Sequence, residues 1–175
     1  MKKIVYNDEI YYFHDNKFVD SSFIEVDTNI ANELGKVMFK NLDYFSYNTS
    51  KLLELINSTK EAGQYKISKD VCMFSLDKFA EDENFVKTLL PILTSNLRKL
   101  KMSQQAVNIG KKYLPLFTTP ALLTSLSAAC CDVGNYEDAL KYANAAYAFQ
   151  GGGFGYQTEL SLVYNRIRKE SKLLD

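Results

Sequence analysis

The same helix–corner–helix pattern occurs at three places in this chain, and the repetition limits the folds that the chain can adopt. The clearest copy has an apolar stripe over residues 122–130, a Gly134–Asn135–Tyr136 corner and a stripe of small residues over 139–146. Apolar residues spaced three and four apart predict an amphipathic helix on each side of the corner. We therefore expect two helices that pack together as an antiparallel hairpin.

The other two copies lie at similar offsets along the sequence. Ala139 stands just inside the second helix, and Ala106 is its counterpart 33 residues earlier. On the same offset, three core positions of one copy match three of the other: Leu90, Leu93 and Leu97 match Leu123, Leu126 and Cys130. Ser68 is the counterpart a further 38 residues back, so a longer connection precedes the middle unit. The extra residues are predicted near 82–84.

Together, the corner, the small residue that follows it and the unit length resemble a tetratricopeptide repeat, which has a unit of about 34 residues. The resemblance implies a stack of helical hairpins that binds a protein or peptide and performs no chemistry. In this family the first helices of each pair line a concave groove. The resemblance therefore places a partner-binding groove on eight residues: Ser95, Arg98, Thr124, Ser125, Ala128, Glu159, Leu162 and Arg166.

The middle and first copies depart from the family's pattern. In the middle copy, Lys101 stands where the corner glycine is expected, Ser103 stands where the tyrosine is expected, and Gly110 lies on the second helix. One subgroup of the family clamps a C-terminal carboxylate with Lys, Asn and Arg side chains. The corresponding positions here carry other residues: Pro91, Ser95, Ser125, Gly155 and Glu159. The clamp is therefore absent, and an ordinary bundle of helical hairpins is the alternative interpretation.

A further helix is predicted over residues 157–170, after the turn at 151–153. Its apolar face carries Leu160, Val163, Tyr164 and Ile167, and its opposite face carries Glu159, Arg166, Lys169 and Glu170. A stack of repeats needs a terminal element with a polar outer face. We interpret this helix as that cap and its charged face as solvated.

The composition changes at the N-terminus, where β-branched and aromatic residues are grouped in three short runs within residues 3–26. Turn-forming residues separate the runs, which predicts a small antiparallel hairpin or three-stranded meander. Asp27–Thr28 offers an N-cap to a helix with Ile30, Leu34, Val37, Met38 and Leu42 on its buried side. The aromatic residues are expected to pack on the helices. In a second hypothesis, Tyr11, Tyr12 and Phe18 form the partner-binding surface instead.

Charge and composition exclude several functions. Lys+Arg and Asp+Glu both total 21, and only three arginines occur. Nucleic-acid binders usually carry a concentrated basic footprint, so nucleic acid is disfavoured, although Arg98, Lys99 and Lys101 could form a local basic patch. No apolar run is long enough to span a bilayer, and no secretory signal is visible, so we expect a cytoplasmic protein without membrane contact.

The sequence lacks the residues that common catalytic and metal sites require. His14 is the one histidine, and it lies in a predicted turn. The three cysteines lack the close paired spacing of structural zinc sites and are expected to be reduced thiols. We therefore expect no enzyme activity, no catalytic residues, no metal and no cofactor.

These observations predict a mainly α fold of about three tetratricopeptide-like antiparallel hairpins with a C-terminal capping helix and a small N-terminal β-hairpin or meander. The expected division is an N-terminal β-hairpin plus helix over 1–45 and helical repeats over 46–175. The expected function is a non-catalytic protein- or peptide-binding scaffold. The alternative is a stoichiometric inhibitor or regulatory subunit that docks on a larger enzyme or complex.

Overall fold

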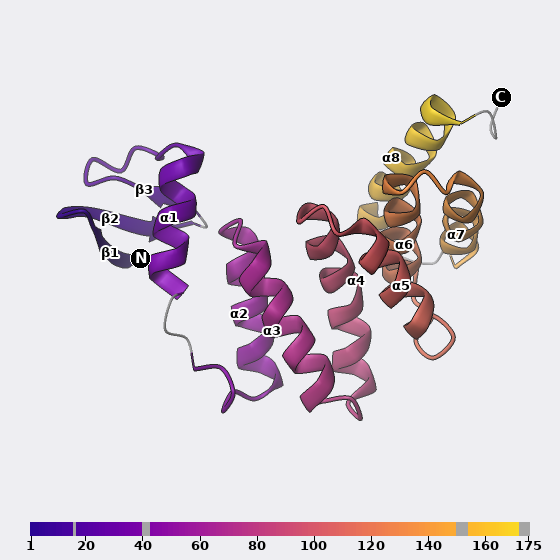
Figure 1. Ribbon diagram of the computed structural model, residues 1–175, viewed down its shortest axis with the longest axis horizontal. Coiled ribbons are helices and arrows are strands. Elements are labelled where there is room, and N and C mark those ends of the chain that lie inside the picture. The colour runs from indigo at the N-terminus through magenta and orange to yellow at the C-terminus, as the bar shows by residue number, and fades with distance from the viewer. Residues whose placement is uncertain (16, 40–42, 150–153, 172–175) are drawn as a thin grey trace. The chain divides into compact units, whose positions relative to one another are not determined.

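The computed structural model describes residues 1–15, 17–39, 43–149 and 154–171, without the side chains of 154–158 (Figure 1). Within this part of the chain, the strands are β1 (Lys2–Tyr6), β2 (Glu9–His14) and β3 (Lys17–Val19). The helices are α1 (Thr28–Phe39), α2 (Thr49–Glu61), α3 (Tyr65–Lys78), α4 (Glu83–Lys99), α5 (Ser103–Tyr113), α6 (Pro120–Asp132), α7 (Tyr136–Ala148) and α8 (Phe154–Glu170). The expectation of a mainly helical chain with a small N-terminal sheet is confirmed. The chain divides into two compact units, residues 1–75 and 76–175.

The first unit begins with an antiparallel sheet in the order β1-β2-β3, which is the predicted meander. Asn7 and Asp8 both have positive φ between β1 and β2, as in the two-residue hairpin turns that match strand twist. Side chains alternate between the two faces of a strand. One face therefore carries Ile4, Tyr11 and Phe18, which form a buried core with a leucine of α1.

Helix α1 covers this face of the sheet. The Asp27 carboxylate accepts hydrogen bonds from the backbone N–H groups of Asn29 and Ile30, so the predicted N-cap is confirmed. Leu34 is fully buried, but Val37 is 41% exposed, so its predicted burial is wrong. Three short strands cover only a narrow stripe of the helix, and Val37 lies outside that stripe. Leu42 lies outside the described residues.

The pair α2–α3 belongs to the first unit through most of its length. Ser68 on α3 donates to the backbone carbonyl of Ile56 on α2 at 3.0 Å. Ala62, at the end of α2, packs against the core of the sheet. The Gln64 amide nitrogen lies 3.4 Å from the carbonyl oxygen of Asn32 on α1. The boundary predicted after residue 45 therefore lies inside this unit.

The corner between the two helices has the same backbone geometry in all three helical pairs. The corner residues are Gly63, Lys101 and Gly134, with φ of 71°, 61° and 76°. The next residue donates its N–H to a carbonyl five positions earlier: Gln64 to Thr59 at 2.8 Å, Met102 to Leu97 at 2.9 Å and Asn135 to Cys130 at 2.9 Å. This is the Schellman helix ending, which needs a left-handed residue at the corner. The predicted Gly134–Asn135–Tyr136 corner is present, with positive φ at its glycine.

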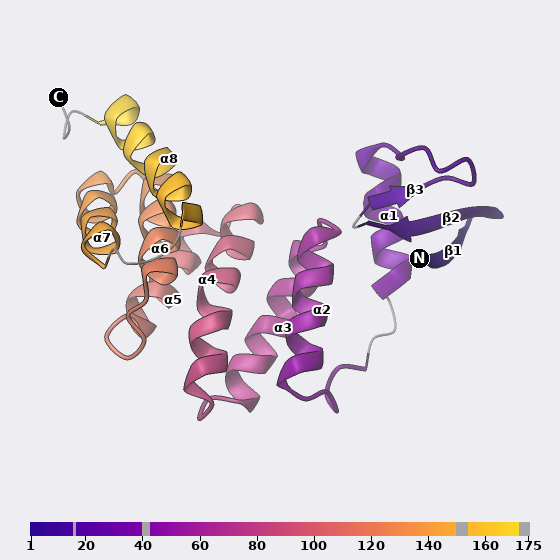
Figure 2. The ribbon, with the colours of Figure 1, turned by 180° about the vertical axis from the view of Figure 1, so that it is seen from behind.

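Helices of the second unit pack in hairpins whose first helices also contact each other. Helix α4 contacts α5 and α6, and α6 contacts α7 and α8 (Figure 2). Ala106 and Ala139 are fully buried, as the 33-residue offset predicted. Ser127 on α6 donates to the backbone carbonyl of Ala139 on α7 at 2.5 Å, which ties the two helices of that pair together.

Helix α8 covers the end of this stack. Leu160, Val163 and Ile167 are buried against α6 and α7, so the predicted apolar face is confirmed at these positions. The Tyr164 hydroxyl donates to the Asn144 side chain at 2.6 Å, which fixes α8 on α7. The glycines at 151–153, expected to form a turn, lie outside the described residues.

Candidate functional site: a basic cavity in the second unit

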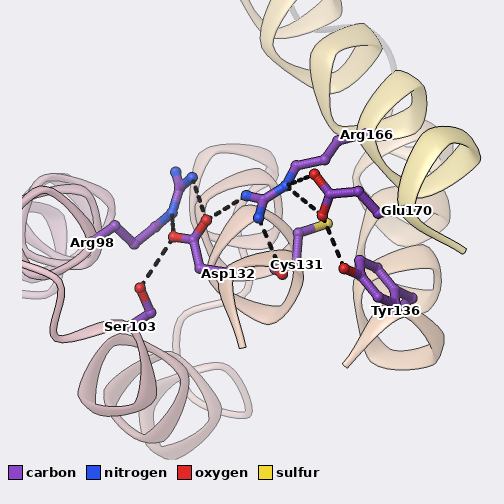
Figure 3. Close-up of polar contacts among 7 residues, drawn as sticks. All are labelled: Arg98, Ser103, Cys131, Asp132, Tyr136, Arg166 and Glu170. Atoms are coloured by element: carbon purple, nitrogen blue, oxygen red, sulfur yellow. Dashed lines mark hydrogen bonds and ion pairs between the residues drawn. The ribbon is translucent and has the colours of Figure 1, made fainter. Parts of the chain in front are cut away.

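A cavity of about 690 Å³ opens where the C-terminal ends of α4 and α6 meet the start of α5 and one side of α8. We call it the basic cavity. Its lining residues are Ser95, Arg98, Lys99, Lys101, Ser103, Gln104, Asp132, Val133 and Arg166. Each lies at a helix end, at the α4–α5 corner or on α8, so the repeated packing of the helices brings them together. Figure 3 shows the central polar residues.

Two arginines and one aspartate form a ladder along one side of the basic cavity. Arg98 Nε donates to Asp132 Oδ2 at 2.7 Å, and its Nη2 lies 3.4 Å from Oδ1. Arg166 Nη1 donates to Oδ1 of the same carboxylate from α8 (Figure 3). The three residues are spaced 34 positions apart in sequence, which is one structural unit. The repeat thus places equivalent positions of α4, α6 and α8 side by side.

Arg166 is held by further partners. Its Nε donates to both Glu170 carboxylate oxygens at 2.9 and 3.0 Å, and its Nη2 donates to the Cys131 carbonyl at 3.3 Å (Figure 3). The Tyr136 hydroxyl donates to Glu170 at 2.9 Å. Tyr136 follows the α6–α7 corner, so these contacts connect α8 to that corner. This guanidinium is fixed in place before any ligand arrives.

Charge pairing keeps both carboxylates ionised. Burial acts to raise the pKa of Asp132, but hydrogen bonds from Arg98 and Arg166 outweigh it and hold that pKa below its usual value. The hydrogen bond from Arg166, followed by that from Tyr136, lowers the pKa of Glu170. Asp132 ends α6, where the helix dipole disfavours negative charge. The two arginines compensate that unfavourable position.

Two lysines leave the basic cavity with an excess of positive charge. Lys99 ends α4 and Lys101 forms the corner, and among the described residues neither side chain forms an ion pair. The arginine charges are matched by Asp132 and Glu170. The lysine charges are therefore unmatched. An anion that enters the basic cavity would meet two net positive charges.

The start of α5 differs from other helix starts in having no side-chain cap among the described residues. The N-cap residues of α2, α4, α6 and α7 are Asn48, Asp82, Thr119 and Asn135, and each side chain accepts a hydrogen bond from the first turn. The N-cap residue of α5 is Met102, which forms no side-chain cap. Ser103 and Gln104, in this first turn, line the basic cavity. A helix start carries a partial positive charge, so it reinforces the lysines.

The structure divides the predicted groove residues among three environments. Ser95, Arg98 and Arg166 line the basic cavity. Thr124 is 3% exposed, and its hydroxyl donates to the Pro120 carbonyl at 2.9 Å. Ala128 is also buried, and Ser125 is half-buried. Glu159 and Leu162 are exposed on α8. Thr124 and Ala128 therefore offer little to a partner.

The arginines are also less available than the sequence suggested. The resemblance placed both in the partner-binding groove, and the face of α8 that carries Arg166 was expected to be solvated. Instead both guanidinium groups bind Asp132. They act first as structural ties between helices.

The aromatic residues of the second hypothesis are placed mainly inside the first unit. Tyr11 and Phe18 are 7% and 4% exposed and belong to the core beneath α1, so they are not available as a surface. Tyr12 lies on the other face of the sheet and stacks on Phe23, with ring centroids 5.5 Å apart. Strand pairing places Val5 beside Ile10 on that face. Val5 and Phe23 are 60% and 57% exposed.

The thiols and acidic groups give little support for chemistry. Burial raises the pKa of Cys72 to about 12 and the pKa of Cys130 to about 11, so both thiols are protonated at neutral pH. Among the residues that the structure describes, no three His, Cys, Asp or Glu side chains gather in a metal-binding group. None of the described helices is both long and apolar enough to cross a membrane.

Sequence reasoning identified Arg98, Lys99 and Lys101 as a local basic group but missed Asp132, the residue that organises it. The missed signal was the 34-residue spacing that links Asp132 to Arg98 and to Arg166. A spacing of one repeat brings residues together in a stack of hairpins.

Comparison with models of protein families and with curated protein sequences finds no match for this chain.

Proposed function

We propose that this chain is a non-catalytic scaffold of the tetratricopeptide type, which binds a protein or peptide segment through the second unit and holds a negatively charged group of that segment in the basic cavity. The repeat assignment is supported by three corners of one geometry and by buried small residues at matching offsets. It is also supported by first helices that contact each other along the stack.

The observation that carries the proposal is the pair of unmatched lysines in a cavity whose other charges are already paired. Lys99 and Lys101 are exposed, and they line the basic cavity together with the two paired arginines. The arginines need no ordering when a ligand binds, because their partners already hold them, whereas the two lysines must be ordered. The high pKa values of the buried thiols argue against a thiolate nucleophile, which favours binding over catalysis.

A second candidate function is that of a stoichiometric inhibitor or regulatory subunit that docks through the first unit. The observation that favours it is the exposed apolar face of the sheet, which presents Val5, Ile10 and Phe23 beside Tyr12. Apolar side chains gathered on a surface often mark a protein interface. This candidate uses the opposite face of the sheet from Tyr11 and Phe18.

The test is capture of partners by the full chain, followed by mass spectrometry and by repetition with two variants that introduce glutamates. Lys99→Glu/Lys101→Glu changes the basic cavity, and Val5→Glu/Phe23→Glu changes the sheet face. Lys141→Glu/Lys169→Glu is the matched control, because both lysines are exposed elsewhere in the second unit. We expect bound segments that are lost only with the first variant.

Two other outcomes would contradict binding through the basic cavity. A single enzyme in equal amount that is lost only with the sheet variant would favour the inhibitor or regulatory subunit. Partners that survive both variants would show that neither surface binds them, and the proposed function would be wrong.

A further inference from the structure

We propose that the basic cavity binds the phosphate group of a phosphorylated side chain in the partner segment, in preference to the carboxylate of an Asp or Glu. This inference rests on the proposed function and adds the chemical class of the anchoring group. Three features of the described residues support it: the net charge, the kind of donors that remain free, and the room in the cavity.

Net charge is the first feature. With the arginines matched by Asp132 and Glu170, the excess charge is that of Lys99 and Lys101. A phosphorylated side chain carries about −1.5 to −2 at neutral pH, whereas a carboxylate carries −1. A dianion therefore neutralises the site, and a carboxylate leaves one positive charge unmatched.

The remaining donors are the second feature. A carboxylate is recognised best by the two parallel N–H groups of one arginine. Asp132 already occupies the Nε and Nη2 side of Arg98, and Asp132, Glu170 and the Cys131 carbonyl occupy Arg166. Among the described residues, the donors that remain are Arg98 Nη1, two lysine point charges and the uncapped first turn of α5. Lysine ammonium groups and helix-start N–H groups both suit the several oxygens of a phosphate.

Room and lining are the third feature. About 690 Å³ lies within the range of roughly 300–1,000 Å³ that is usual for ligand sites, so the cavity can hold a modified side chain with its neighbours. Among the side chains that the structure describes, no aromatic one lines it. Proteins that bind single-stranded nucleic acid usually stack bases on aromatic side chains. A phosphorylated protein segment therefore fits the cavity better than an oligonucleotide does.

The experiment uses the full chain and three pools of peptides with random flanking residues, whose central residue is phosphoserine, glutamate or serine. Binding is measured by fluorescence anisotropy at physiological salt, and the site is mapped by amide NMR. Because charge-assisted contacts to both lysines are lost in Lys99→Gln/Lys101→Gln, we expect about tenfold weaker binding of the phosphoserine pool by this variant. Lys141→Gln/Lys169→Gln should bind it like the native chain.

The supporting result is tighter binding of the phosphoserine pool than of the glutamate pool, with amide shifts concentrated at Lys101, Ser103 and Gln104. Equal binding of the phosphoserine and glutamate pools, both weakened by the lysine variant, would overturn the phosphate proposal and leave the proposed function standing. Binding of none of the pools, with no protein segment captured in the partner experiment, would overturn both.

Two additional probes complete the test. Inorganic phosphate that binds at the same amides as tightly as the phosphoserine pool would identify a free small anion as the ligand and would overturn the proposal. A single-stranded RNA oligonucleotide that binds more tightly than the phosphoserine pool, and is lost with the lysine variant, would overturn it in favour of nucleic acid.

Discussion

The α4–α5 corner and the α6–α7 corner follow the same backbone path with different residues. Lys101 has φ of 61° at the first, and Gly134 has φ of 76° at the second. The left-handed region costs a residue with a side chain about 1–2 kcal/mol relative to its ordinary conformation, and glycine pays no such penalty. The second corner is therefore relaxed and the first is strained.

The strained corner is the one at the basic cavity. Lys101 lines that cavity and brings one of its two unmatched charges, while Gly134 contributes no side chain to it. A backbone outlier is a reason to ask what its side chain does. We infer that the corner of the α4–α5 pair is less stable than that of the α6–α7 pair because it carries a lysine, whose charge contributes to the basic cavity. Substitutions in both helical pairs test this difference between the corners.

The largest change in stability is expected at the buried alanines, where the α4–α5 pair and the α6–α7 pair are alike. Ala106→Leu and Ala139→Leu each add a bulky side chain at a fully buried contact inside a hairpin. Overpacking of this kind costs about 1–3 kcal/mol, and we expect about 2–3 kcal/mol at both positions in urea unfolding. Ala148→Leu is the control, since Ala148 is exposed on α7. If only one of the two buried variants were destabilised, Ala106 and Ala139 would not occupy equivalent positions in their helical pairs.

The next effect concerns Asp132, which joins the α6–α7 pair to the α4–α5 pair through Arg98. Asp132→Asn removes the charge that both arginines bind, and its side chain is only 20% exposed. Hydrogen bonds to charged groups contribute about 1.5–3 kcal/mol, so with one neutral acceptor kept we expect a loss of about 1–2 kcal/mol in the free energy of unfolding at neutral pH.

This loss should depend on pH in a defined direction. The pKa of Asp132 is lower in the folded chain than its ordinary value. A depressed pKa stabilises the fold above the unfolded pKa, which is about 3.9, and that stability disappears as pH falls through the folded pKa. The difference between the native chain and Asp132→Asn should therefore be full near neutral pH and shrink below about pH 4. A difference that stayed constant down to acid unfolding would contradict the ion-pair explanation.

Local patterns predicted the elements well, and the errors came from long-range packing. The corner at Gly134, the N-cap at Asp27 and the small residue at Ala139 depend on a few neighbouring positions, and all were correct. Thr124 was expected in the groove, but neighbouring helices bury it, and its hydroxyl turns back to its own helix.

The site was harder to predict than the fold because it depends on pairs of residues far apart in sequence. The sequence placed both arginines in the predicted groove, but their partner Asp132 is one repeat away from each. Only the stacking of α4, α6 and α8 brings the three together. The unmatched state of Lys99 and Lys101 depends on which carboxylates the arginines bind, so no local pattern indicates it.

A smaller effect is expected at the relaxed corner. Gly134→Ala should lower the free energy of unfolding by about 1 kcal/mol, because a Cβ is disfavoured at positive φ. Apart from Gly134 and its two chain neighbours, none of the described residues has a heavy atom within 4 Å of the position that the new Cβ would occupy, so this cost is conformational and not steric. The measurement is urea unfolding. An unchanged midpoint would mean that the corner residue can leave the left-handed region without loss, and the difference between the corners would have no energetic meaning.

The smallest change in stability is expected from Lys101→Gly, which tests the difference between the two corners most directly. Glycine relieves the strain at φ of 61° but adds freedom to the unfolded chain, so we expect a net gain of about 0.5 kcal/mol in stability. The same change removes one of the two unmatched charges of the basic cavity, so binding of an anionic segment should weaken. Lys101→Gln is the control, since it removes the charge and keeps the strain, and it should weaken binding without the gain in stability. If Lys101→Gly were both more stable and equally able to bind, the strained lysine would serve no purpose in the cavity.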